Sequence, residues 1–380
     1  MQNDDRIKLL ILLPNLISGG GQRIVVNFLY NLDRTKFKPL LLVQERLGAF
    51  LEEVERVCDP DEIEFLQDRP YKRSDLPGLI ARTIARARSF DIILGGLEGR
   101  ASTSGLIAAK LLGKPFLGWI HIDWRPFSEE VSWRQMLALR AYKMADRLVA
   151  CSAGAGDNFS ALFNIPRDRI TTILNMIPCD AILDAAAQPL PPEHEKLFEK
   201  PVVLMVGRLE EQKGYPHLIE AHARLIKAGI DHNLVIIGEG SLLYVIKDQV
   251  TRLGVDDTVH FLGFQKNPHR YMARATVFTL SSEFEGFGLV LAEALMCGAP
   301  VVATDCLSGP AEVLGGGDFG RLVPPKDPEA LAQALGQLLR DPDMRAQLSV
   351  RGPERARQFD QSTVGQEWQD LLTAMARRKA

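Results

Sequence analysis

Short apolar runs alternate with longer amphipathic segments along the whole chain, and few folds accommodate such a pattern. In the first half, the apolar runs are Leu9–Leu13, Leu40–Val43, Ile92–Leu94, Phe116–Ile120, Leu148–Cys151 and Ile170–Leu174. Segments of helix length separate them, near Gln22–Leu32, Leu76–Ala87, Ala101–Leu112, Glu129–Met144 and Ala153–Phe163. Strands that are apolar on both faces and alternate with helices predict parallel βαβ units covered on both sides.

The same alternation returns in the second half. Its predicted strands are Val202–Val206, Leu234–Ile237, Val259–Leu262, Val277–Leu280 and Val301–Ala303, and its predicted helices include Tyr215–Lys227, Leu242–Leu253 and Leu289–Cys297. Residues 181–200 between the halves are rich in Ala and Pro, which favours a linker. The 380 residues suffice for two cores. The sequence therefore predicts an α/β chain with two doubly wound, Rossmann-like domains, residues 1–180 and 201–360, facing a central cleft, followed by an amphipathic segment within 361–380.

Composition excludes several classes of protein. The chain carries 45 basic and 48 acidic residues, a net charge of −3, so nucleic acid is not an expected partner. Its five cysteines are scattered without a C-x-x-C pair, which disfavours disulfides and zinc sites and fits a cytoplasmic location. The polar N-terminus does not resemble a signal peptide. The longest apolar stretch, Leu9–Ile17, is too short to span a membrane.

Glycine-rich turns follow three of the predicted strands, at the sheet edge where doubly wound domains bind ligands. The first contains Gly19, Gly20 and Gly21, which allow backbone amides to approach an anion at a helix N-terminus. It is not the dinucleotide fingerprint, because Ile24 stands where a third glycine is needed. A flexible turn is the alternative interpretation.

The second turn, Gly207–Gly214, places Arg208 and Lys213 after a buried strand. Arg208 can make a forked contact and Lys213 a point-charge contact with phosphate oxygens, so the turn suits a diphosphate. A solvated basic loop is the alternative, which the position directly after a buried strand disfavours.

The third turn runs from Ser281 into the helix that is predicted to begin at Leu289. Glu285 lies in the loop, where a carboxylate can accept hydrogen bonds from sugar hydroxyls. The amides of Phe287, Gly288 and Leu289 are expected to face an anion. Glu293 lies further along the helix in an apolar segment, where a diol such as a ribose would satisfy it. A structural ion pair or a cap is the alternative for Glu293.

Together, G-R-x4-K-G at Gly207–Gly214 and E-x7-E at Glu285 and Glu293 resemble the retaining glycosyltransferases of the GT-B fold, specifically glycosyltransferase family 4. The resemblance covers nearly the whole chain, including a terminal helix expected to cross back to the N-terminal, acceptor-binding domain. It implies that Arg208 and Lys213 contact the diphosphate of a nucleotide-sugar donor, that Glu285 holds the sugar, and that Glu293 holds the ribose.

The resemblance also assigns the remaining site residues. His121, at the end of the strand Phe116–Ile120, matches the family's histidine beside the donor sugar, although a lone histidine is more often structural. The implied catalytic residues are His121, Glu285, Arg208 and Lys213. The implied donor-binding residues are Gly20, Gly21, Gly207, Arg208, Lys213, Glu285, Gly286, Phe287, Gly288, Leu289 and Glu293.

The segment Asp305–Leu314 resembles bacterial family 4 enzymes that extend lipid-linked oligosaccharides or surface polysaccharides such as lipopolysaccharide. It implies a UDP-sugar donor, with UDP-N-acetylhexosamine favoured weakly, and a glycan or lipid-linked acceptor. Transfer with retention, through front-face attack, needs no metal and no cofactor when cations and helix amides stabilise the departing diphosphate. The motifs Asp59-Pro-Asp61 and Asp341-Pro-Asp343 are therefore interpreted as loops or helix caps.

Three alternatives share parts of this pattern: a sugar phosphorylase, a UDP-sugar epimerase, and a non-enzymatic protein that senses sugar nucleotides. Peripheral contact with an anionic membrane, at the inner face of the cytoplasmic membrane, is also considered. Between Arg69 and Arg88 there are six basic residues and one acid, with Leu76, Leu79 and Ile80 nearby, so an interfacial helix and a solvated helix face are both possible. Trp119, Trp124 and Trp133 could add anchoring or belong to the core.

Overall fold

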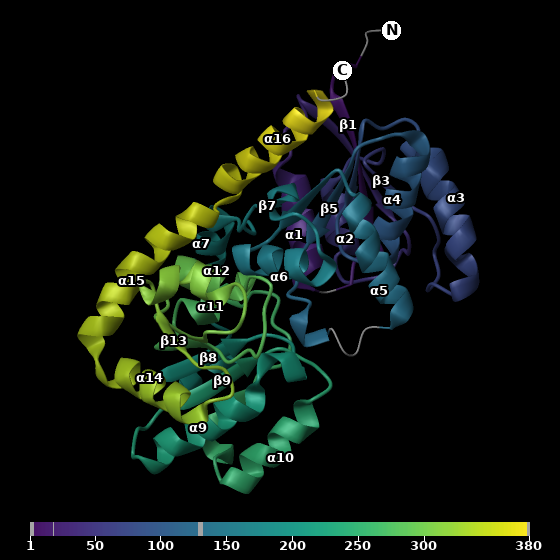
Figure 1. The fold of residues 1–380 in the computed structure, drawn as a ribbon. Helices are drawn as coiled ribbons and strands as arrows, with labels where there is room; N and C mark the ends of the chain where they lie inside the picture. The colour runs from purple at the N-terminus through teal and green to yellow at the C-terminus, as the bar shows by residue number, and fades with distance from the viewer. Residues whose placement is uncertain (1–3, 18, 128–131, 378–380) are drawn as a thin grey trace. The chain divides into compact units, whose positions relative to one another are not determined.

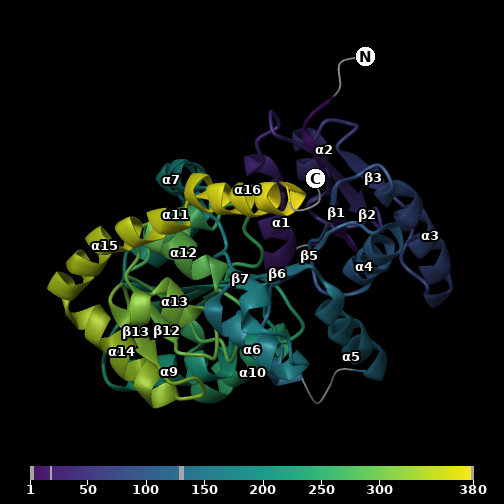
Figure 2. The ribbon, with the colours of Figure 1, turned by 45° about the horizontal axis from the view of Figure 1, so that its top comes forward.

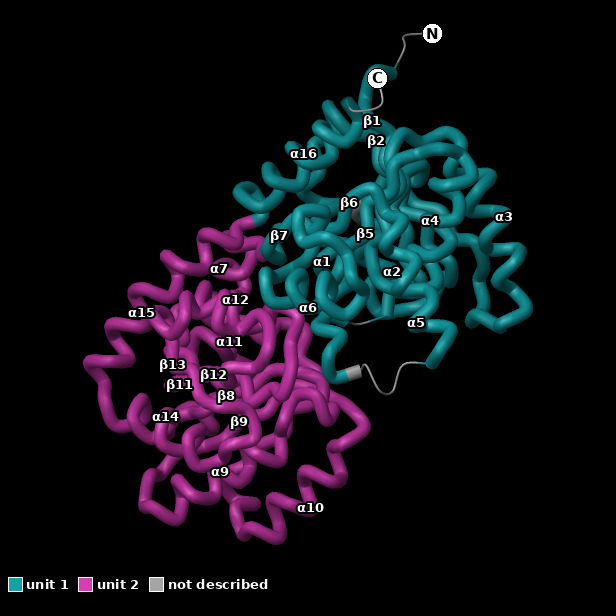
Figure 3. Tube along the Cα trace, in the orientation of Figure 1, with its two compact units in different colours: residues 1–176, 361–380 teal, residues 177–360 magenta. Residues whose placement is uncertain are grey.

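The structure is a computed structural model that describes residues 4–17, 19–127 and 132–377. It divides into two compact units (Figure 3): unit 1 comprises residues 1–176 and 361–380, and unit 2 comprises residues 177–360. Each unit contains one parallel sheet with helices between successive strands (Figure 1). The predicted α/β class with two doubly wound sheets is confirmed.

Unit 1 contains a seven-stranded sheet in the order β3-β2-β1-β4-β5-β6-β7. Its strands are β1 (Ile7–Leu13), β2 (Phe37–Val43), β3 (Ile63–Phe65), β4 (Ile92–Gly95), β5 (Phe116–Ile120), β6 (Arg147–Ala150) and β7 (Ile170–Thr172). Its helices are α1 (Gly20–Asn31), α2 (Leu51–Val57), α3 (Leu76–Ala87), α4 (Arg100–Leu112), α5 (Trp133–Arg140), α6 (Ala153–Phe163) and α16 (Gln361–Arg377).

Side-chain alternation along the strands explains why both faces of this sheet are covered. Leu10 and Leu12 of β1 belong to the same apolar cluster as residues of α3 and α4. Trp119 of β5 instead contacts Phe28 of α1 and Trp368 of α16, with ring centroids 5.8 Å and 4.2 Å away. Because successive side chains of a strand point to opposite faces, a strand that is apolar at every position must be covered twice.

Unit 2 repeats the arrangement with six strands in the order β10-β9-β8-β11-β12-β13. The strands are β8 (Val202–Val206), β9 (Asn233–Ile237), β10 (Val259–Phe261), β11 (Val277–Leu280), β12 (Val301–Thr304) and β13 (Arg321–Val323). The helices are α7 (Cys179–Ala187), α8 (Pro192–Glu195), α9 (Tyr215–Lys227), α10 (Leu243–Leu253), α11 (His269–Met272), α12 (Leu289–Met296), α13 (Pro310–Val313), α14 (Pro328–Arg340) and α15 (Pro342–Ala356).

Strand order reverses at one place in each sheet. Chain order runs outward from β1 and β4 in unit 1, and from β8 and β11 in unit 2. Each reversal leaves the loops after its two central strands side by side at the carboxyl edge, which is where doubly wound sheets bind ligands. These four loops contain most of the candidate site residues, whereas His121 follows β5 and Glu293 lies in α12.

The structure corrects several predicted boundaries. Residues 181–200, expected to form a linker, contain most of α7 and all of α8. The helix expected from Glu129 begins at Trp133, and residues 129–131 lie outside the described residues. The chain also contains strands and helices that the sequence did not predict, namely β3, β13, α2, α7, α8, α11, α13, α14 and α15.

The C-terminal helix α16 belongs to unit 1, where it packs beside α1 (Figure 2). Trp368 of α16 is fully buried, and its ring centroid lies 5.1 Å from that of Phe28. At the start of the helix, the side-chain amide of Asn31 donates a hydrogen bond to Gln361 Oε1 at 2.9 Å. The last described segment of the chain thus completes the core of the unit that contains its beginning.

Candidate active site

Two loops of unit 2 meet at the carboxyl edge of its sheet, one after β8 and one after β11. Glu283 donates a backbone hydrogen bond to the carbonyl of Gln212 at 2.8 Å, and the Gln212 side-chain amide donates to the carbonyl of Phe284 at 2.9 Å. The Ser281 hydroxyl donates to the Lys213 carbonyl at 2.8 Å. The loop that contains the predicted cations and the loop that contains Glu285 are therefore held together by one backbone–backbone hydrogen bond and by two side chains that donate to backbone carbonyls.

Gly214 explains how closely the two loops approach. Its φ is +63°, in the left-handed region, and a Cβ at this position would lie 2.1 Å from the carbonyl oxygen of Ser281. Only glycine avoids both the backbone strain and the clash. Gly207 lies at the start of the same loop, where its carbonyl accepts a hydrogen bond from the Tyr215 hydroxyl at 2.8 Å.

Lys213 and Glu285 form an ion pair in which Nζ lies 2.5 Å from Oε1. The side chains are only 15% and 9% exposed. The Ser282 hydroxyl donates a second hydrogen bond to Glu285 Oε1, at 2.7 Å. Motif reasoning assigned Lys213 to phosphate and Glu285 to sugar without anticipating this contact. It follows only from the strand order, which makes β8 and β11 neighbours.

Arg208 differs from Lys213 because its side chain is exposed to solvent. It follows Gly207 directly after β8, so the two predicted cations share one loop but not one environment. A half-buried lysine is positioned by its carboxylate partner, whereas the Arg208 guanidinium is accessible to an incoming anion.

The loop before α12 places backbone amides at the start of that helix. Gly288 is its N-cap residue with φ +84°, and Leu289 is the first helical residue. Phe287 is buried, and its ring packs against Phe359 with centroids 5.4 Å apart. Gly286 lies between Glu285 and this buried anchor. The segment therefore presents backbone rather than a side chain to the helix N-terminus, as an anion site requires.

Glu293 lies in the second turn of α12 and contacts a residue of another helix. Its Oε2 is 3.8 Å from Nε2 of His269 in α11, and the two side chains are 19% and 20% exposed. At 3.8 Å the contact is too long for a hydrogen bond, and it is an ion pair only when His269 is protonated. The Glu293 carboxylate keeps some access to solvent.

A further ion-pair group includes Glu283, in the loop between β11 and α12, and was missed by sequence reasoning. Glu283 lies 2.9 Å from Lys326 Nζ and 3.5 Å from His217 Nε2. The Glu283 carboxylate raises the pKa of Lys326 above its usual value. Lys326 also adopts a left-handed backbone conformation, with φ +60°. No spacing pattern links residues 217, 283 and 326, so only the fold could reveal the group.

In unit 1, His121 directly follows β5 and is buried. Its Nε2 lies 2.7 Å from the carbonyl of Gly96, and its ring stacks at 4.7 Å on Trp119. Nδ1 has no hydrogen-bond partner among the residues that the structure describes. Burial lowers the pKa of His121 to about 4, so the imidazole is neutral at physiological pH. Neutral His121 donates through Nε2 to the carbonyl and keeps an acceptor at Nδ1.

The glycine loop after β1 lies against this histidine. A Cβ on Gly21 would be 2.5 Å from the Leu97 side chain and 3.8 Å from the His121 ring, whereas Gly20 faces open space. The structure therefore brings Gly21 and His121 together at the carboxyl edge of the unit 1 sheet. Both belong to the predicted site.

Glu98, which sequence reasoning missed, lies beside His121 at the end of β4. Its Oε1 accepts the backbone N–H of His121 at 2.8 Å and the indole N–H of Trp124 at 3.3 Å. Burial raises the pKa of the Glu98 carboxyl to about 7. A single glutamate in the string Leu97-Glu98-Gly99-Arg100 carries no motif, so only its contacts reveal it.

No group of three His, Cys, Asp or Glu side chains that could hold a metal ion occurs among residues 4–17, 19–127 and 132–377. Asp341 instead caps α15, accepting the backbone N–H of Met344 at 2.8 Å, as the cap interpretation predicted. Asp59 and Asp61 are exposed residues in the turn after α2.

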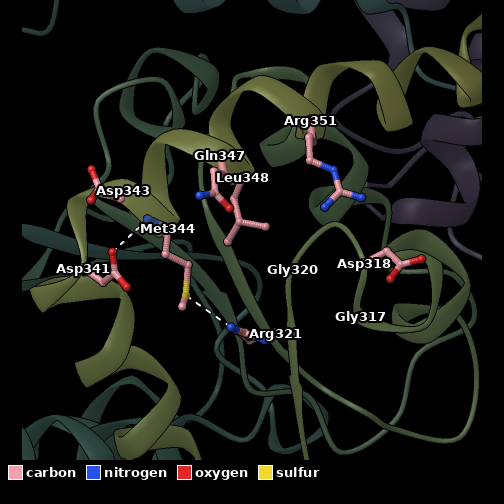
Figure 4. A pocket seen from close by; sticks show the side chains of 10 residues that line it. All are labelled: Gly317, Asp318, Gly320, Arg321, Asp341, Asp343, Met344, Gln347, Leu348 and Arg351. Carbon is pink, nitrogen blue, oxygen red and sulfur yellow. Dashed lines mark hydrogen bonds between the residues drawn. The ribbon is translucent and has the colours of Figure 1, made fainter.

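A cavity of about 400 Å³ lies elsewhere on unit 2 (Figure 4). It is lined by residues that precede or begin β13, including Asp318 and Arg321, and by residues of the α15 segment from its N-cap Asp341 to Arg351. These residues adjoin the amino end of a strand, whereas ligands of doubly wound sheets bind at the carboxyl ends. The cavity contains none of the predicted site residues. The candidate site is therefore identified by the carboxyl ends of the strands and not by this cavity.

The chain was compared with known proteins. A family profile described as "Glycosyltransferase Family 4" matches residues 18–181, and one described as "Glycosyl transferases group 1" matches residues 188–355. Among solved structures, HepE of Anabaena in complex with UDP and glucose has a TM-score of 0.83 at 23% identity, covering 97% of this chain and 100% of that one.

Curated relatives match over part of their length. An N-acetylgalactosamine-N,N'-diacetylbacillosaminyl-diphospho-undecaprenol 4-alpha-N-acetylgalactosaminyltransferase of Campylobacter jejuni is 32% identical over 226 residues, 60% of each chain. The O-antigen chain mannosyltransferase B of Escherichia coli is 32% identical, over 52% of each chain. This chain thus matches less than two thirds of either relative's length.

The two profiles cover adjoining segments, one in each half of the chain, and both describe glycosyltransferases. Both sheets have the order and the parallel direction that the matched fold requires, and the arginine, lysine and two glutamates that suggested the resemblance lie in the second matched segment. The chain therefore belongs to the GT-B-fold glycosyltransferases of the family 4 type.

Proposed function

We propose that this protein is a retaining glycosyltransferase that moves a sugar from a nucleotide-sugar donor to a glycan or lipid-linked saccharide acceptor in bacterial surface-polysaccharide assembly. The observation that carries the proposal is the largely buried Lys213–Glu285 ion pair, held between two loops at the point where strand order reverses. A cation and a carboxylate in contact there can address the two charged parts of such a donor, its diphosphate and its reacting sugar.

The ion pair suggests how the donor is received. A diphosphate brings negative charge that competes with Glu285 for the Lys213 ammonium, while exposed Arg208 adds a forked contact. The amides at the start of α12 supply further positive potential. These groups stabilise the charge that develops on the departing diphosphate. Glu285, released in part from Lys213, then accepts hydrogen bonds from the sugar hydroxyls and faces the developing positive charge.

The remaining site residues receive proposed roles on chemical grounds. Glu293 keeps solvent access beside His269, which suits a bidentate contact with the ribose diol. His121 is neutral and has an unpaired Nδ1 that can accept a hydrogen bond from a donor-sugar hydroxyl. Gly20 and Gly21 let the donor approach the backbone of the first loop. We propose front-face transfer, in which the leaving phosphate accepts the proton of the acceptor hydroxyl.

A UDP-sugar is the proposed donor. HepE was solved with UDP and with UDP-glucose, and the Campylobacter relative is named for transfer of N-acetylgalactosamine, which supports UDP-N-acetylhexosamine. That relative is also named for a diphospho-undecaprenol acceptor, which supports a lipid-linked acceptor here. An enzyme with such an acceptor would act in the cytoplasm, at the inner face of the cytoplasmic membrane.

We propose that the reaction needs neither metal nor cofactor, because cations and helix amides can supply the positive charge. Turnover should therefore persist in excess EDTA. Complete loss of turnover on chelation, with recovery on adding Mg²⁺ or Mn²⁺, would contradict this part of the proposal and direct attention to the Asp59/Asp61 and Asp341/Asp343 pairs.

A panel of UDP-, GDP- and ADP-sugars tests the proposal as a whole. A ligand that binds only the native state must raise apparent stability, so the correct donor should raise the melting temperature most. Consumption of that donor should then require an acceptor. A donor that binds but is never consumed would indicate a sugar-nucleotide sensor, and conversion of the sugar without acceptor would indicate an epimerase. Either result would overturn the proposed function.

A further inference from the structure

A set of large apolar side chains on unit 1 faces solvent instead of the core. They lie on α5 and on the following 3-10 helix, Ala141–Met144. Trp133 is 71% exposed, Leu137 63% and Met144 52%. Trp133 and Leu137 are four residues apart, so they are neighbours on one side of α5. We call these three side chains the α5 surface, together with the neighbouring basic residues Arg134, Arg140 and Lys143.

The core does not explain this exposure, because the same segment has a separate buried side. Leu139 and Tyr142 are buried, and Met136 packs against the main apolar cluster of unit 1. The helix is therefore apolar on two sides, only one of which the unit covers. An exposed apolar patch on a soluble domain is characteristic of an interaction site.

Charge indicates the kind of partner. Between Ser132 and Ala145 the sequence contains Arg134, Arg140 and Lys143 and no acidic residue. All three basic side chains are exposed, and the Arg134 guanidinium lies over the Trp133 ring, 5.0 Å from its centroid. Exposed tryptophan, leucine and methionine flanked by basic groups of one sign match the boundary between apolar chains and anionic headgroups.

The segment that the sequence suggested for membrane contact is different and fits less well. In α3, Leu79 is fully buried, and Leu76 and Ile80 are half-buried, so no apolar face is available for insertion. Arg69 and Arg86 are paired with Asp75 and Glu64. The burial of these apolar side chains therefore favours the solvated-face interpretation of residues 69–88 over the interfacial helix. Trp119 belongs to the core, and of the three tryptophans considered only Trp133 is exposed.

No helix within the described parts of the chain is long and apolar enough to cross a bilayer. We propose that the α5 surface docks on an anionic lipid bilayer, with Trp133, Leu137 and Met144 entering the interface and Arg134, Arg140 and Lys143 meeting lipid phosphates. This inference stands apart from the proposed function, because it needs neither donor nor acceptor.

Vesicle binding tests the inference with the full-length protein and without any substrate. The protein is mixed with vesicles of phosphatidylcholine alone or of phosphatidylcholine with phosphatidylglycerol, and binding is measured by flotation. We expect binding to the anionic vesicles and at least about tenfold weaker binding to the neutral ones, since each basic side chain contributes about a fivefold factor near such a surface. Added salt should weaken the binding. Absence of binding to anionic vesicles would overturn the proposal.

Variants locate the contact. Trp133→Ser/Leu137→Ser should reduce vesicle affinity at least about tenfold, because it removes most of the exposed apolar area. The matched control is Tyr244→Ser/Val245→Ser on α10 of unit 2, whose side chains are 81% and 56% exposed. The control should bind vesicles as the wild type does. Equal losses in both double variants, or none in the first, would overturn the assignment to α5.

Tryptophan fluorescence gives an independent readout of insertion. The chain has four tryptophans, of which Trp119 and Trp368 are fully buried and Trp124 is half-buried. Anionic vesicles should therefore shift the emission to shorter wavelength through Trp133, and Trp133→Phe should abolish the shift while retaining most of the binding. If Trp133→Ser/Leu137→Ser instead abolishes a concentration-dependent dimer in the absence of lipid, the surface binds a second copy and the lipid proposal is wrong.

Discussion

At the scale of single residues, the candidate site depends on one contact that motif reasoning treated as two separate features. Lys213 and Glu285 are 72 residues apart in sequence, yet they share a hydrogen bond of 2.5 Å. Removing either residue therefore leaves a charge without its partner in a half-buried position, which is costly. Arg208 is exposed to solvent, so its substitution leaves no buried charge without a partner. Substituting the two cations should therefore have different effects on the free energy of unfolding.

Arg208→Ala and Lys213→Ala should each weaken binding of the free nucleoside diphosphate by about 1.5–3 kcal/mol, the range for hydrogen bonds to charged groups. Only Lys213→Ala should also lower the free energy of unfolding, because it leaves the Glu285 carboxylate unpaired. Calorimetric titration and urea unfolding on the same preparations measure both quantities. The double variant Lys213→Ala/Glu285→Gln should recover part of the lost stability but none of the affinity. Wild-type affinity in both single variants would refute the phosphate assignment.

The two glutamates should separate turnover from nucleotide affinity. Glu285→Gln keeps the size of the side chain but removes the charge that faces the reacting sugar, so it should lower kcat at least about a hundredfold while leaving affinity for the free nucleoside diphosphate within about threefold. Glu293→Gln should weaken the free nucleotide and the sugar nucleotide by similar factors, the mark of uniform binding. A purely structural role for Glu293 beside His269 predicts a lower melting temperature with unchanged nucleotide affinity.

At the scale of elements, the apolar pattern predicted most strands and the helices between them, but it missed two edge strands and several helices, including the long α14 and α15. β5, β8, α3, α6 and α9 have the bounds that the apolar pattern predicted. β3 and β13 are three residues long and lie at sheet edges, where partial burial leaves no continuous apolar run. The predicted linker contains α7 because that helix packs on α11 and α12 and buries Ile182 and Ala186, a tertiary contact that composition cannot express.

The same limit applies to the candidate site. Arg208, Lys213, Glu285 and Glu293 follow from spacing, because each lies at a fixed offset from a predicted strand or helix. Glu98, Glu283 and Lys326 do not, because their relevance comes from partners in other elements. The sequence pattern predicts which residues lie at the end of a strand. It does not predict which strand ends are neighbours in the sheet.

A buried pair of histidines joins α9 to β9 and makes unit 2 sensitive to acid. Nδ1 of His222 lies 2.9 Å from Nε2 of His232, whose Nδ1 faces the Ile230 carbonyl at 2.8 Å. Because a carbonyl only accepts, His232 must donate from Nδ1 and accept at Nε2, so His222 donates from Nδ1. Burial, with His232 and His260 nearby, lowers the pKa of His222 to about 3. The folded state therefore keeps His222 neutral where an unfolded chain would protonate it.

The sign of the pH effect follows. Between about pH 6.5, the ordinary histidine value, and the folded value near 3, the unfolded state binds the extra proton, so stability is lost as pH falls. One such proton corresponds to about 1.4 kcal/mol per pH unit. His222→Gln should cost stability at pH 7.5 but make the loss between pH 6 and pH 5 shallower by about that amount, as measured by urea unfolding. Parallel pH profiles for the variant and the wild type would contradict the assignment.

At the scale of the whole molecule, the chain leaves unit 1 after Met176 and returns to it at Gln361. The two crossings lie side by side, because Ile177 pairs with Asp360 in a parallel bridge and donates a backbone hydrogen bond to the Phe359 carbonyl at 2.9 Å. Unit 1 is thus discontinuous in sequence, and its core includes residues that follow unit 2 in the chain. Trp368 is the largest of these buried side chains.

Trp368→Ala should destabilise unit 1 without affecting unit 2. Trp368 is fully buried against Trp119 and Phe28, and truncating a buried tryptophan costs about 3–5 kcal/mol. Because Trp119 also stacks on His121, the loss should reach the candidate site and lower turnover, while nucleotide affinity, which we assign to unit 2, stays near the wild-type value. Hydrogen exchange resolved by segment should be faster than in the wild type in residues 4–176 and unchanged in residues 177–360. Trp133→Ala, at a tryptophan that is 71% exposed, is the matched control and should leave exchange unchanged. If exchange rises equally in both units, the C-terminal helix does not serve unit 1 alone.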